Sequence, residues 1–405
     1  MSKKTPNQKT NNSIKDIGKN ICTGCKLCQD ICPENAISFK YDEEGFWYPS
    51  VNTNLCINCG ICKKYCPTLF PEKRLNKANH VPITLGVWNK NEMIRWESTS
   101  GGFFSTLAEY LIKNGYYVAG AVYDKEFKVT HIISQNLVDI QKMRQSKYSQ
   151  SDTKYIYKKI LNLLKNGEKV FFCGTPCQVE ALHQIVNDCT KNLITMDFVC
   201  AGISSPIVFQ RYIQWLENKY HSSVTKVWFK NKKEGWDQIG TQISFKNGKT
   251  YFRIGSRDPF MISFVKDYAN IRKSCFNCKY RKIPHNSDFT VGDFWGIEKF
   301  HPELNDNLGI TALIINTSDG INVFNSIEKF FHIIDTTPEE IIKYNPTVIN
   351  SLQEGEKRHE FLVNTLTRGL NYAINRYSSY KGIKKIKLDL MYLKKKTKII
   401  LSKIF

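Results

Sequence analysis

The sequence predicts an α/β body with a mainly parallel or mixed sheet, preceded by a small α+β ferredoxin-like iron–sulfur domain. Two observations support this prediction: one spacing of cysteines occurs twice near the start of the chain, and helices alternate with strands over much of the remainder. A chain of 405 residues has room for the cysteine-rich part, which we call the head, and for one or two further domains. We place the boundaries at 1–19 for a disordered lead, 20–71 for the head, 84–350 for the body and 351–405 for a basic helical C-terminal segment.

The head carries the pattern C-x2-C-x2-C-x3-C-P twice, about 34 residues apart. Pairs of 4Fe–4S clusters bind to such runs, and the fourth cysteine of each run ligates the other cluster. Regular repetition, the prolines and the absence of nearby histidine oppose a disulfide framework or a zinc site. We therefore predict one cluster on Cys22, Cys25, Cys28 and Cys66, and a second on Cys56, Cys59, Cys62 and Cys32.

The rest of the head offers little apolar material for a core. Residues 36–54 alternate apolar and polar side chains around Glu44-Gly45, which predicts a hairpin. With so small a core, the clusters should hold this part together, and we expect it to unfold without iron. Residues 67–82 have the Pro, Lys and Asn content of a linker.

Composition narrows the setting of the protein. The sequence contains no stretch of 18 apolar residues, so it predicts no transmembrane helix. Residues 1–20 lack the apolar core of a signal peptide. Fourteen cysteines, eight of them in the two runs, indicate a reducing cytoplasm. The formal charge of +21 would offset bound anions and attract an acidic electron carrier such as a ferredoxin or flavodoxin. The sequence contains no stripe of Arg and aromatic residues of the kind that would indicate nucleic-acid binding.

The body reads as alternating elements with short loops. Strands are expected at 85–88, 116–122, 169–173 and 193–200, and helices at 103–113, 156–164 and 179–186. In such sheets, ligands collect at the carboxyl ends of the strands. The small residues 98–102 open a helix there, and they suit either an anion or an ordinary N-cap.

Six further cysteines follow the head. Cys173, Cys177 and Cys200 fall at strand ends or in a turn, and Cys275 and Cys278 form a pair further along the chain, whereas Cys189 has the context of an ordinary thiol. Convergence on one sheet edge would give a third cluster or a zinc site. Scattered buried cysteines are the alternative that spacing alone leaves open.

Taken together, six segments resemble one family, the beta subunits of coenzyme F-420-reducing hydrogenases and dehydrogenases. They are residues 98–102, 146–151, 172–178, 197–202, 274–280 and 291–296, within a stretch of resemblance covering about 84–350. The resemblance implies FAD and a 4Fe–4S cluster in the body. Some relatives reduce a deazaflavin, plant relatives reduce a chlorophyll precursor with ferredoxin, and bacterial relatives with this head are often associated with polysaccharide synthesis.

Carried over residue by residue, the resemblance implies a set of site residues. The body-cluster ligands would be Cys177, Cys200, Cys275 and Cys278, while Cys173 also fits a buried thiol. The flavin contacts would be Ser100, Gly101, Gly102, Lys147, Tyr148, Ser151, Thr175, Gln178, Gly292 and Asp293. Structural alternatives are a solvated surface lysine for Lys147, and a turn glycine with a capping Asp for Gly292 and Asp293.

One position departs from the family pattern. Many relatives have His after the cysteine matched by Cys200, whereas this chain has Ala201. If that His donates a proton in the relatives, this chain must use another group or pass electrons only, so we name no catalytic acid.

The C-terminal segment is strongly basic. Residues 381–405 contain nine Lys against one acidic residue, Asp389, interleaved with apolar residues. A helix packed on the body is one interpretation, and a basic amphipathic helix on an anionic membrane surface is the other.

These observations predict an iron–sulfur flavoprotein oxidoreductase that relays electrons between its ferredoxin-type clusters and FAD to reduce or oxidise an unidentified substrate. Two alternatives belong to other classes. One is a non-catalytic electron-transfer subunit for a partner oxidoreductase. The other is a flavin-free iron–sulfur protein with a sensing or structural role.

Overall fold

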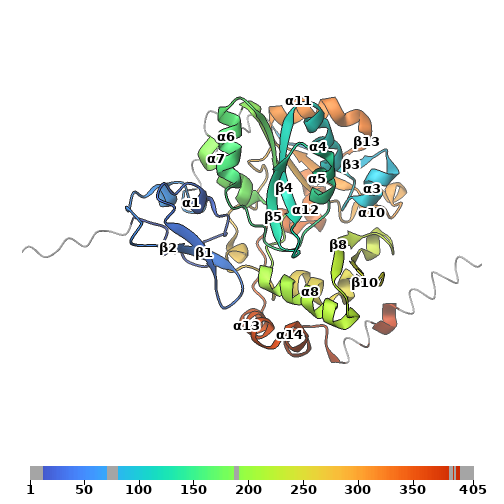
Figure 1. The fold of residues 1–405 in the computed structure, drawn as a ribbon. Coiled ribbons are helices and arrows are strands. Elements are labelled where there is room, and N and C mark those ends of the chain that lie inside the picture. The colour runs from blue at the N-terminus through green and yellow to red at the C-terminus, as the bar shows by residue number, and fades with distance from the viewer. Residues whose placement is uncertain (1–11, 71–80, 187–190, 383–385, 387–388, 393–405) are drawn as a thin grey trace, which may run out of the picture.

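The computed structural model describes residues 12–70, 81–186, 191–382, 386 and 389–392. The head lies to one side of a large sheet that carries helices on both faces, and a smaller sheet with further helices lies below it (Figure 1). Among the described residues, no helix combines the length and apolar character needed to cross a bilayer.

The head is a hairpin with two short helices. Strands β1 (Ile37–Tyr41) and β2 (Trp47–Val51) pair antiparallel, which confirms the predicted hairpin, and helices α1 (Leu27–Asp30) and α2 (Ile61–Lys64) flank it. Its own apolar core is small, with Ile14 and Ile37 packed beside Cys62. Because Ile14 is buried there, the prediction of a disordered lead does not hold for residues 12–19, and residues 1–11 lie outside the described part.

The large sheet has eight strands in the order β13-β3-β12-β11-β7-β6-β4-β5. The bounds are β3 Ile83–Asn89, β4 Tyr116–Tyr123, β5 Val129–Ser134, β6 Lys169–Cys173, β7 Leu193–Phe198, β11 Phe289–Asp293, β12 Thr311–Ile315 and β13 Phe331–Asp335. The four central strands β4, β6, β7 and β11 run parallel, and every pairing outside them is antiparallel. The sheet is therefore mixed, and the parallel part is its centre.

Helices cover both faces because alternate strand residues are apolar on each side. One face carries α4 (Phe103–Lys113), α5 (Leu137–Met143) and α11 (Ser318–Ile327). The other carries α6 (Ile156–Lys165), α7 (Pro176–Val186), α10 (Ile297–Phe300) and α12 (Pro338–Tyr344). Helix α3 (Glu92–Glu97) follows β3, and Asn91 caps it.

A second layer supports the large sheet from below. Its strands are β8 (Val224–Asn231), β9 (Gly240–Phe245) and β10 (Thr250–Ile254), and its helices are α8 (Pro206–Tyr220), α9 (Pro259–Val265), α13 (Arg358–Arg368) and α14 (Leu370–Tyr377). Short 3-10 helices are η3 Trp236–Gln238, η4 Gly255–Arg257, η5 Lys273–Asn277, η6 Pro302–Leu304, η7 Glu328–Phe330 and η8 Pro346–Val348. Thus part of the C-terminal segment is built into the core, where Phe361 and Leu362 are fully buried.

Candidate functional site

Four cysteines of the head surround one small space at its outer end. Cys32, Cys56, Cys59 and Cys62 line a cavity of about 20 Å³, and the Cys59 side chain is exposed. This is the grouping that the spacing predicts, with the fourth cysteine of the first run joining three of the second. We call these four the outer cysteines.

The other four head cysteines are close enough to influence one another's ionisation. Burial raises the pKa of Cys28, and the neighbouring thiols Cys25, Cys22 and Cys66 raise it further, with the smallest contribution from Cys62 of the outer cysteines. This set again matches the predicted grouping, with Cys66 joining the first run. We call Cys22, Cys25, Cys28 and Cys66 the inner cysteines.

The remaining predicted ligands meet in the body. Cys177 lies in the first turn of α7, Cys200 follows β7, and Cys275 and Cys278 lie in and directly after η5. All four, which we call the body cysteines, line one cavity of about 40 Å³. They surround this space rather than meet at a point: within the described ranges, no three His, Cys, Asp or Glu side chains could hold a single metal ion.

The walls of this body-cysteine cavity suit an anionic cluster. Three buried polar atoms in its lining have no hydrogen-bond partner among the described residues: Nε2 of His285, Oγ of Ser274 and Nε of Arg281. Burial also raises the pKa of Cys200 to about 11 and that of Cys275 to about 12. Thiols in such surroundings become thiolates readily only beside a cation, which iron would provide. The donor set therefore fits a 4Fe–4S cluster.

The head lies directly against this cavity. Ile21, Thr23 and Thr68 of the head complete its lining, and the hydroxyl oxygens of Thr68 and Tyr280 are 3.1 Å apart. Cys25 is near enough to raise the pKa of Cys177. The inner cysteines and the body cysteines are thus neighbours across the boundary between head and body.

Arg272 of the body connects the head to the body at this boundary. Its side chain is fully buried. Its Nε donates to the carbonyl oxygen of Cys22 at 2.8 Å, and its Nη2 donates to that of Trp47 at 3.1 Å. Since Arg272 lies three residues before Cys275, one side chain ties the inner cysteines to the body cysteines.

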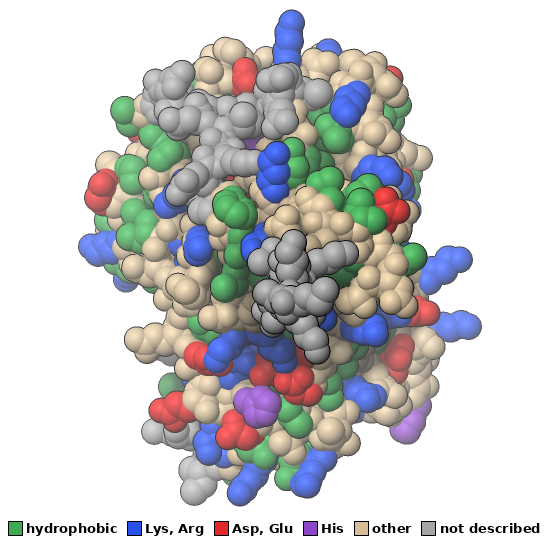
Figure 2. All heavy atoms as spheres, turned by 90° about the vertical axis from the view of Figure 1, so that its left-hand side faces the viewer, with side chains coloured by type: hydrophobic (Ala, Val, Ile, Leu, Met, Phe, Trp, Pro, Cys, Tyr) green, Lys and Arg blue, Asp and Glu red, His purple; other side chains and the backbone are tan. Residues whose placement is uncertain are grey.

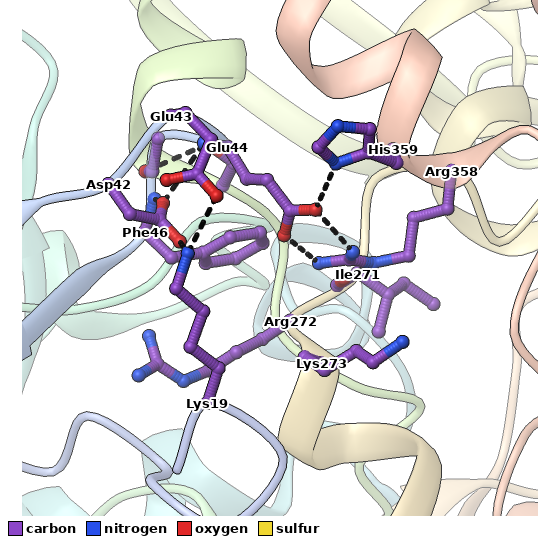
Figure 3. A network of polar contacts seen from close by, with 12 residues as sticks. Lys19, Asp42, Glu43, Glu44, Phe46, Ile271, Arg272, Lys273, Arg358 and His359 are labelled. Carbon is purple, nitrogen blue, oxygen red and sulfur yellow. Dashed lines mark hydrogen bonds and ion pairs between the residues drawn. The ribbon is translucent and has the colours of Figure 1, made fainter. Parts of the chain in front are cut away.

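An ion pair between Glu44 and Arg358 holds the tip of the hairpin (Figure 3). The Glu44 carboxylate accepts from Nη1 and Nη2 of Arg358 at 2.9 and 2.7 Å, and from Nδ1 of His359 at 2.9 Å. Burial alone would raise the pKa of Glu44, but Arg358 and His359 outweigh it and lower that pKa. Helix α13 therefore anchors the head through charge as well as shape.

The head also caps a helix of the body. The carboxylate of Asp30 accepts from the backbone N–H groups of Tyr155 at 2.7 Å and Tyr157 at 3.1 Å. These groups belong to the first turn of α6, whose own N-cap residue supplies no side-chain bond. An acidic group at a helix N-terminus is favoured by the helix dipole, so Asp30 stabilises α6 and the docked head together.

A much larger cavity, of about 1130 Å³, opens at the carboxyl ends of β6, β7 and β11. The two cavities share part of their walls: Val199, Cys200 and Gly202 are among the residues that line both this cavity and the body-cysteine cavity. Its size exceeds that of an ordinary ligand pocket and suits a dinucleotide. Nine of the ten predicted flavin contacts line it: Ser100, Gly102, Lys147, Tyr148, Ser151, Thr175, Gln178, Gly292 and Asp293.

Gly101 is the exception. It does not line the cavity, and its N–H donates to Oγ1 of Thr311 at 2.8 Å. A Cβ at this position would collide with the carbonyl oxygen of Val87. The expectation that Gly101 brings backbone close to a ligand is therefore corrected: the glycine is needed where the turn packs on β3 and β12. Gly102, with φ of +93°, begins α4 at the cavity wall.

Lys147 lies in the cavity wall in an unusual setting. Its Nζ donates to the carbonyl oxygens of Met143 at 3.1 Å and Arg144 at 2.8 Å, where α5 ends. Burial lowers the pKa of Lys147 to about 7. The structure thus places the Lys147 amine in the cavity wall, with several of its hydrogen bonds already made inside the protein.

Two other predicted contacts are similarly engaged. The Asp293 carboxylate forms an ion pair with Lys230, which raises the pKa of that lysine even though burial opposes the rise. Oε1 of Gln178 accepts from the N–H of Thr175 at 2.9 Å and so closes the turn into α7. These side chains shape the wall, and their polar groups stabilise one another.

Several lining residues were missed by the sequence analysis. His131 lies between Oγ of Ser151, at 2.5 Å from Nδ1, and the carbonyl oxygen of Cys173, at 3.2 Å from Nε2. Burial lowers the pKa of His131 to about 4, so the ring is neutral at pH 7. Arg144 and Lys230 were missed as well. Arg144 adjoins the 146–151 segment, which was the available signal, whereas nothing local singles out His131 or Lys230.

Two remaining predictions concern single segments. Cys173 lines the large cavity and not the body-cysteine cavity, and Cys189 lies outside the described residues. The described end of the basic segment packs on the body: Asp389 accepts from Nε of Arg257 at 2.6 Å, and Tyr392 lines the large cavity.

Comparison with known proteins finds two family models, each of which matches part of the chain. Residues 167–339 match the family model for the C terminus of the coenzyme F420 hydrogenase/dehydrogenase beta subunit, and residues 21–69 match that of a 4Fe-4S dicluster domain. Among solved structures, the chain is similar to one in the F420-reducing NiFe hydrogenase complex from Methanosarcina barkeri. That similarity has 14% identity and a TM-score of 0.45, and it covers 76% of this chain and 97% of that one. A comparison with the curated proteins found no match. The chain is therefore an iron–sulfur protein related to the coenzyme F420 hydrogenase/dehydrogenase beta subunit: a 4Fe-4S dicluster domain precedes a body of which residues 167–339 match the C terminus of that subunit.

Proposed function

We propose that this protein is an iron–sulfur flavoprotein oxidoreductase. Electrons would move along the outer, inner and body cysteines, each set holding one 4Fe–4S cluster, to FAD in the large cavity. The single observation that carries the proposal is the succession of cavities. The body-cysteine cavity borders the head on one side and shares Cys200 with the large cavity on the other.

The large cavity has the chemistry that a flavin dinucleotide needs. When bound, FAD couples one-electron to two-electron chemistry, which clusters alone do not provide. Beside the turn at 98–102 lie Arg144, which also pairs with Glu97, and Lys147, whose lowered pKa of about 7 would rise beside the negative charge of a bound pyrophosphate. Nε of Arg144 and Oγ1 of Thr241 are buried in the lining without a hydrogen-bond partner among the described residues. Both groups can donate to a ligand.

The outer end of the head suits a small electron carrier. Ile57 and Leu55, which flank Cys56, have exposed fractions of 63% and 51%. Lys and Arg side chains are scattered among apolar ones over the face that the head occupies (Figure 2). Since the chain carries a net charge of +21, an acidic ferredoxin or flavodoxin would be attracted to it.

The test uses full-length protein purified without oxygen. We expect about twelve irons per chain, since three cubanes hold four each, together with one FAD. Cys275→Ala should remove about four of these irons and keep both the FAD and the head clusters. It should also slow reduction of the flavin by a low-potential donor. Cys173→Ala is the matched control, because Cys173 lines the flavin cavity but none of the cysteine cavities.

A non-catalytic electron-transfer subunit is the second candidate. The exposed apolar side chains beside the outer cysteines favour it, because they would also fit a partner oxidoreductase. Protein with about twelve irons that binds no FAD, even after incubation with it, would contradict the flavoenzyme and leave this candidate. Iron at about eight per chain would contradict the third cluster.

A further inference from the structure

His285 and Asp197 form a buried pair beside the body cysteines. Nδ1 of His285 lies 2.9 Å from Oδ2 of Asp197, and the two residues are only 6% and 1% exposed. The other carboxylate oxygen, Oδ1, accepts from Oγ1 of Thr290 at 2.7 Å. A carboxylate fixed in this way accepts a hydrogen bond, so Nδ1 carries a proton and the orientation of the ring is set.

The second ring nitrogen has no partner in the surrounding protein that the structure describes. Nε2 of His285 is buried and has no hydrogen-bond partner among the described residues, and His285 lines the cavity that the four body cysteines surround. A buried polar atom without a hydrogen-bond partner is unfavourable, because it has lost its contact with water and gained nothing in return. The occupant of this cavity is therefore the natural partner of Nε2.

We propose that His285 donates a hydrogen bond from Nε2–H to a sulfur atom of the body cluster, and that Asp197 holds it in position. This rests on the proposed function, which places the cluster there. Four cysteines already provide one ligand for each iron of a cubane, so the imidazole is a fifth contact and not a ligand. The ring is then protonated on both nitrogens, as an imidazolium between the Asp197 carboxylate and the anionic cluster, and it donates from Nδ1 to Asp197 and from Nε2 to the cluster.

Such a bond changes the energy of the cluster. A reduced cluster carries more negative charge than an oxidised one, so a donor at its sulfur stabilises the reduced form and raises the reduction potential. Removing a charge-assisted bond of this kind should shift the ratio of oxidised to reduced cluster about tenfold at fixed potential, or 59 mV for a one-electron couple. The potentials of the two head clusters should stay the same.

The experiment is a redox titration of anaerobic full-length protein, followed by electron paramagnetic resonance. His285→Leu removes the donor, and His285→Gln keeps an N–H on a side chain of similar reach. His332→Leu is the matched control, since His332 stacks on Trp88 at the far edge of the sheet. Signals that are absent from the Cys275→Ala variant identify the body cluster.

We expect His285→Leu to retain about twelve irons and to lower the potential of the body cluster alone. His285→Gln should recover most of the shift. Pulsed measurements with nitrogen-15 histidine should show a weak nitrogen coupling in the wild type that is lost in His285→Leu.

An unchanged potential in His285→Leu, or an equal shift in His332→Leu, would overturn the proposal. So would a strong coupling typical of direct coordination, which would make His285 a ligand. The proposed function fails separately, because the wild type would then show no third cluster at all.

Discussion

Glu44 shows how much of the docked head depends on single side chains. Its carboxylate is almost fully buried and accepts hydrogen bonds from Arg358 and His359. Glu44→Gln removes the negative charge and leaves the Arg358 guanidinium buried without it. Breaking a buried ion pair costs about 3–5 kcal/mol, so we expect the hairpin to separate from α13 far more often. Hydrogen exchange of the backbone amides of residues 42–48 would measure this as lost protection.

The neighbouring glutamate supplies the control. Glu43 is exposed and pairs with Lys19, so Glu43→Gln should change little. Because Arg358 and His359 lower the pKa of Glu44, its contribution is present above the usual carboxyl pKa and is lost as the pH falls through the lowered value. The difference between wild type and Glu44→Gln should therefore persist down to about pH 5 and narrow only below about pH 4. A difference that is already lost at about pH 5 would contradict this account.

Single residues also show where prediction from sequence succeeds. The spacing of the head cysteines predicts two sets, and the structure brings the members of each set close together, because three of the four lie in one local loop. The body cysteines were chosen from the family resemblance, since their spacing alone left the site open. Gly101 was misread because its neighbours, Val87 and Thr311, come from distant strands. His131 and Arg272 were not found for the same reason, since their partners are fixed by the tertiary fold.

Among the helices of the body, α6 depends on a side chain of the head for its N-terminal cap. Asp30 occupies the position of an N-cap for this helix, although it lies 125 residues away from Tyr155. Asp30→Ala would leave the first N–H groups of α6 buried without an acceptor. We expect it to cost about 1–2 kcal/mol and to loosen both α6 and the inner cysteines. Hydrogen exchange in residues 155–158 and the rate of iron loss to a chelator would measure these two effects.

Asn136→Ala is the matched control for this prediction. Asn136 caps α5 within the body by accepting from the N–H of Val138 at 2.8 Å. Its loss should destabilise α5 by a similar amount without changing the rate of iron loss. If both variants lose iron equally fast, the head does not depend on the cap that Asp30 provides.

Elements with a strong local signal were predicted well. The helix at 103–113 was predicted with the bounds that α4 has, because its apolar face and the flanking glycines define it. The parallel centre of the sheet followed from alternating helices and strands. The antiparallel flanks β12 and β13 and the smaller sheet β8–β10 were not predicted, because short strands pair with segments far along the chain.

At the scale of the whole molecule, the outer cysteines line a cavity that, among the residues the structure describes, only those of the head border, whereas the large cavity lies in the body. Cys59→Ala should remove about four irons and leave FAD bound. It should also slow reduction of the flavin by a reduced ferredoxin, because the carrier would have to reach the inner cysteines directly. Stopped-flow absorbance would follow the flavin. Cys173→Ala should keep both the iron and the rate, and an unchanged rate in Cys59→Ala would show that electrons enter elsewhere.

The ion pair between Glu44 and Arg358 also has a consequence for biosynthesis. Its partners are 314 residues apart in the chain. At about 5–20 residues per second, a ribosome that has completed the hairpin needs roughly 16–60 s more to reach α13. For most of that interval the inner cysteines have neither Arg272 nor α13 against them. An iron donor that acts during synthesis would therefore meet the head while it is still open, and one that acts afterwards would meet it closed.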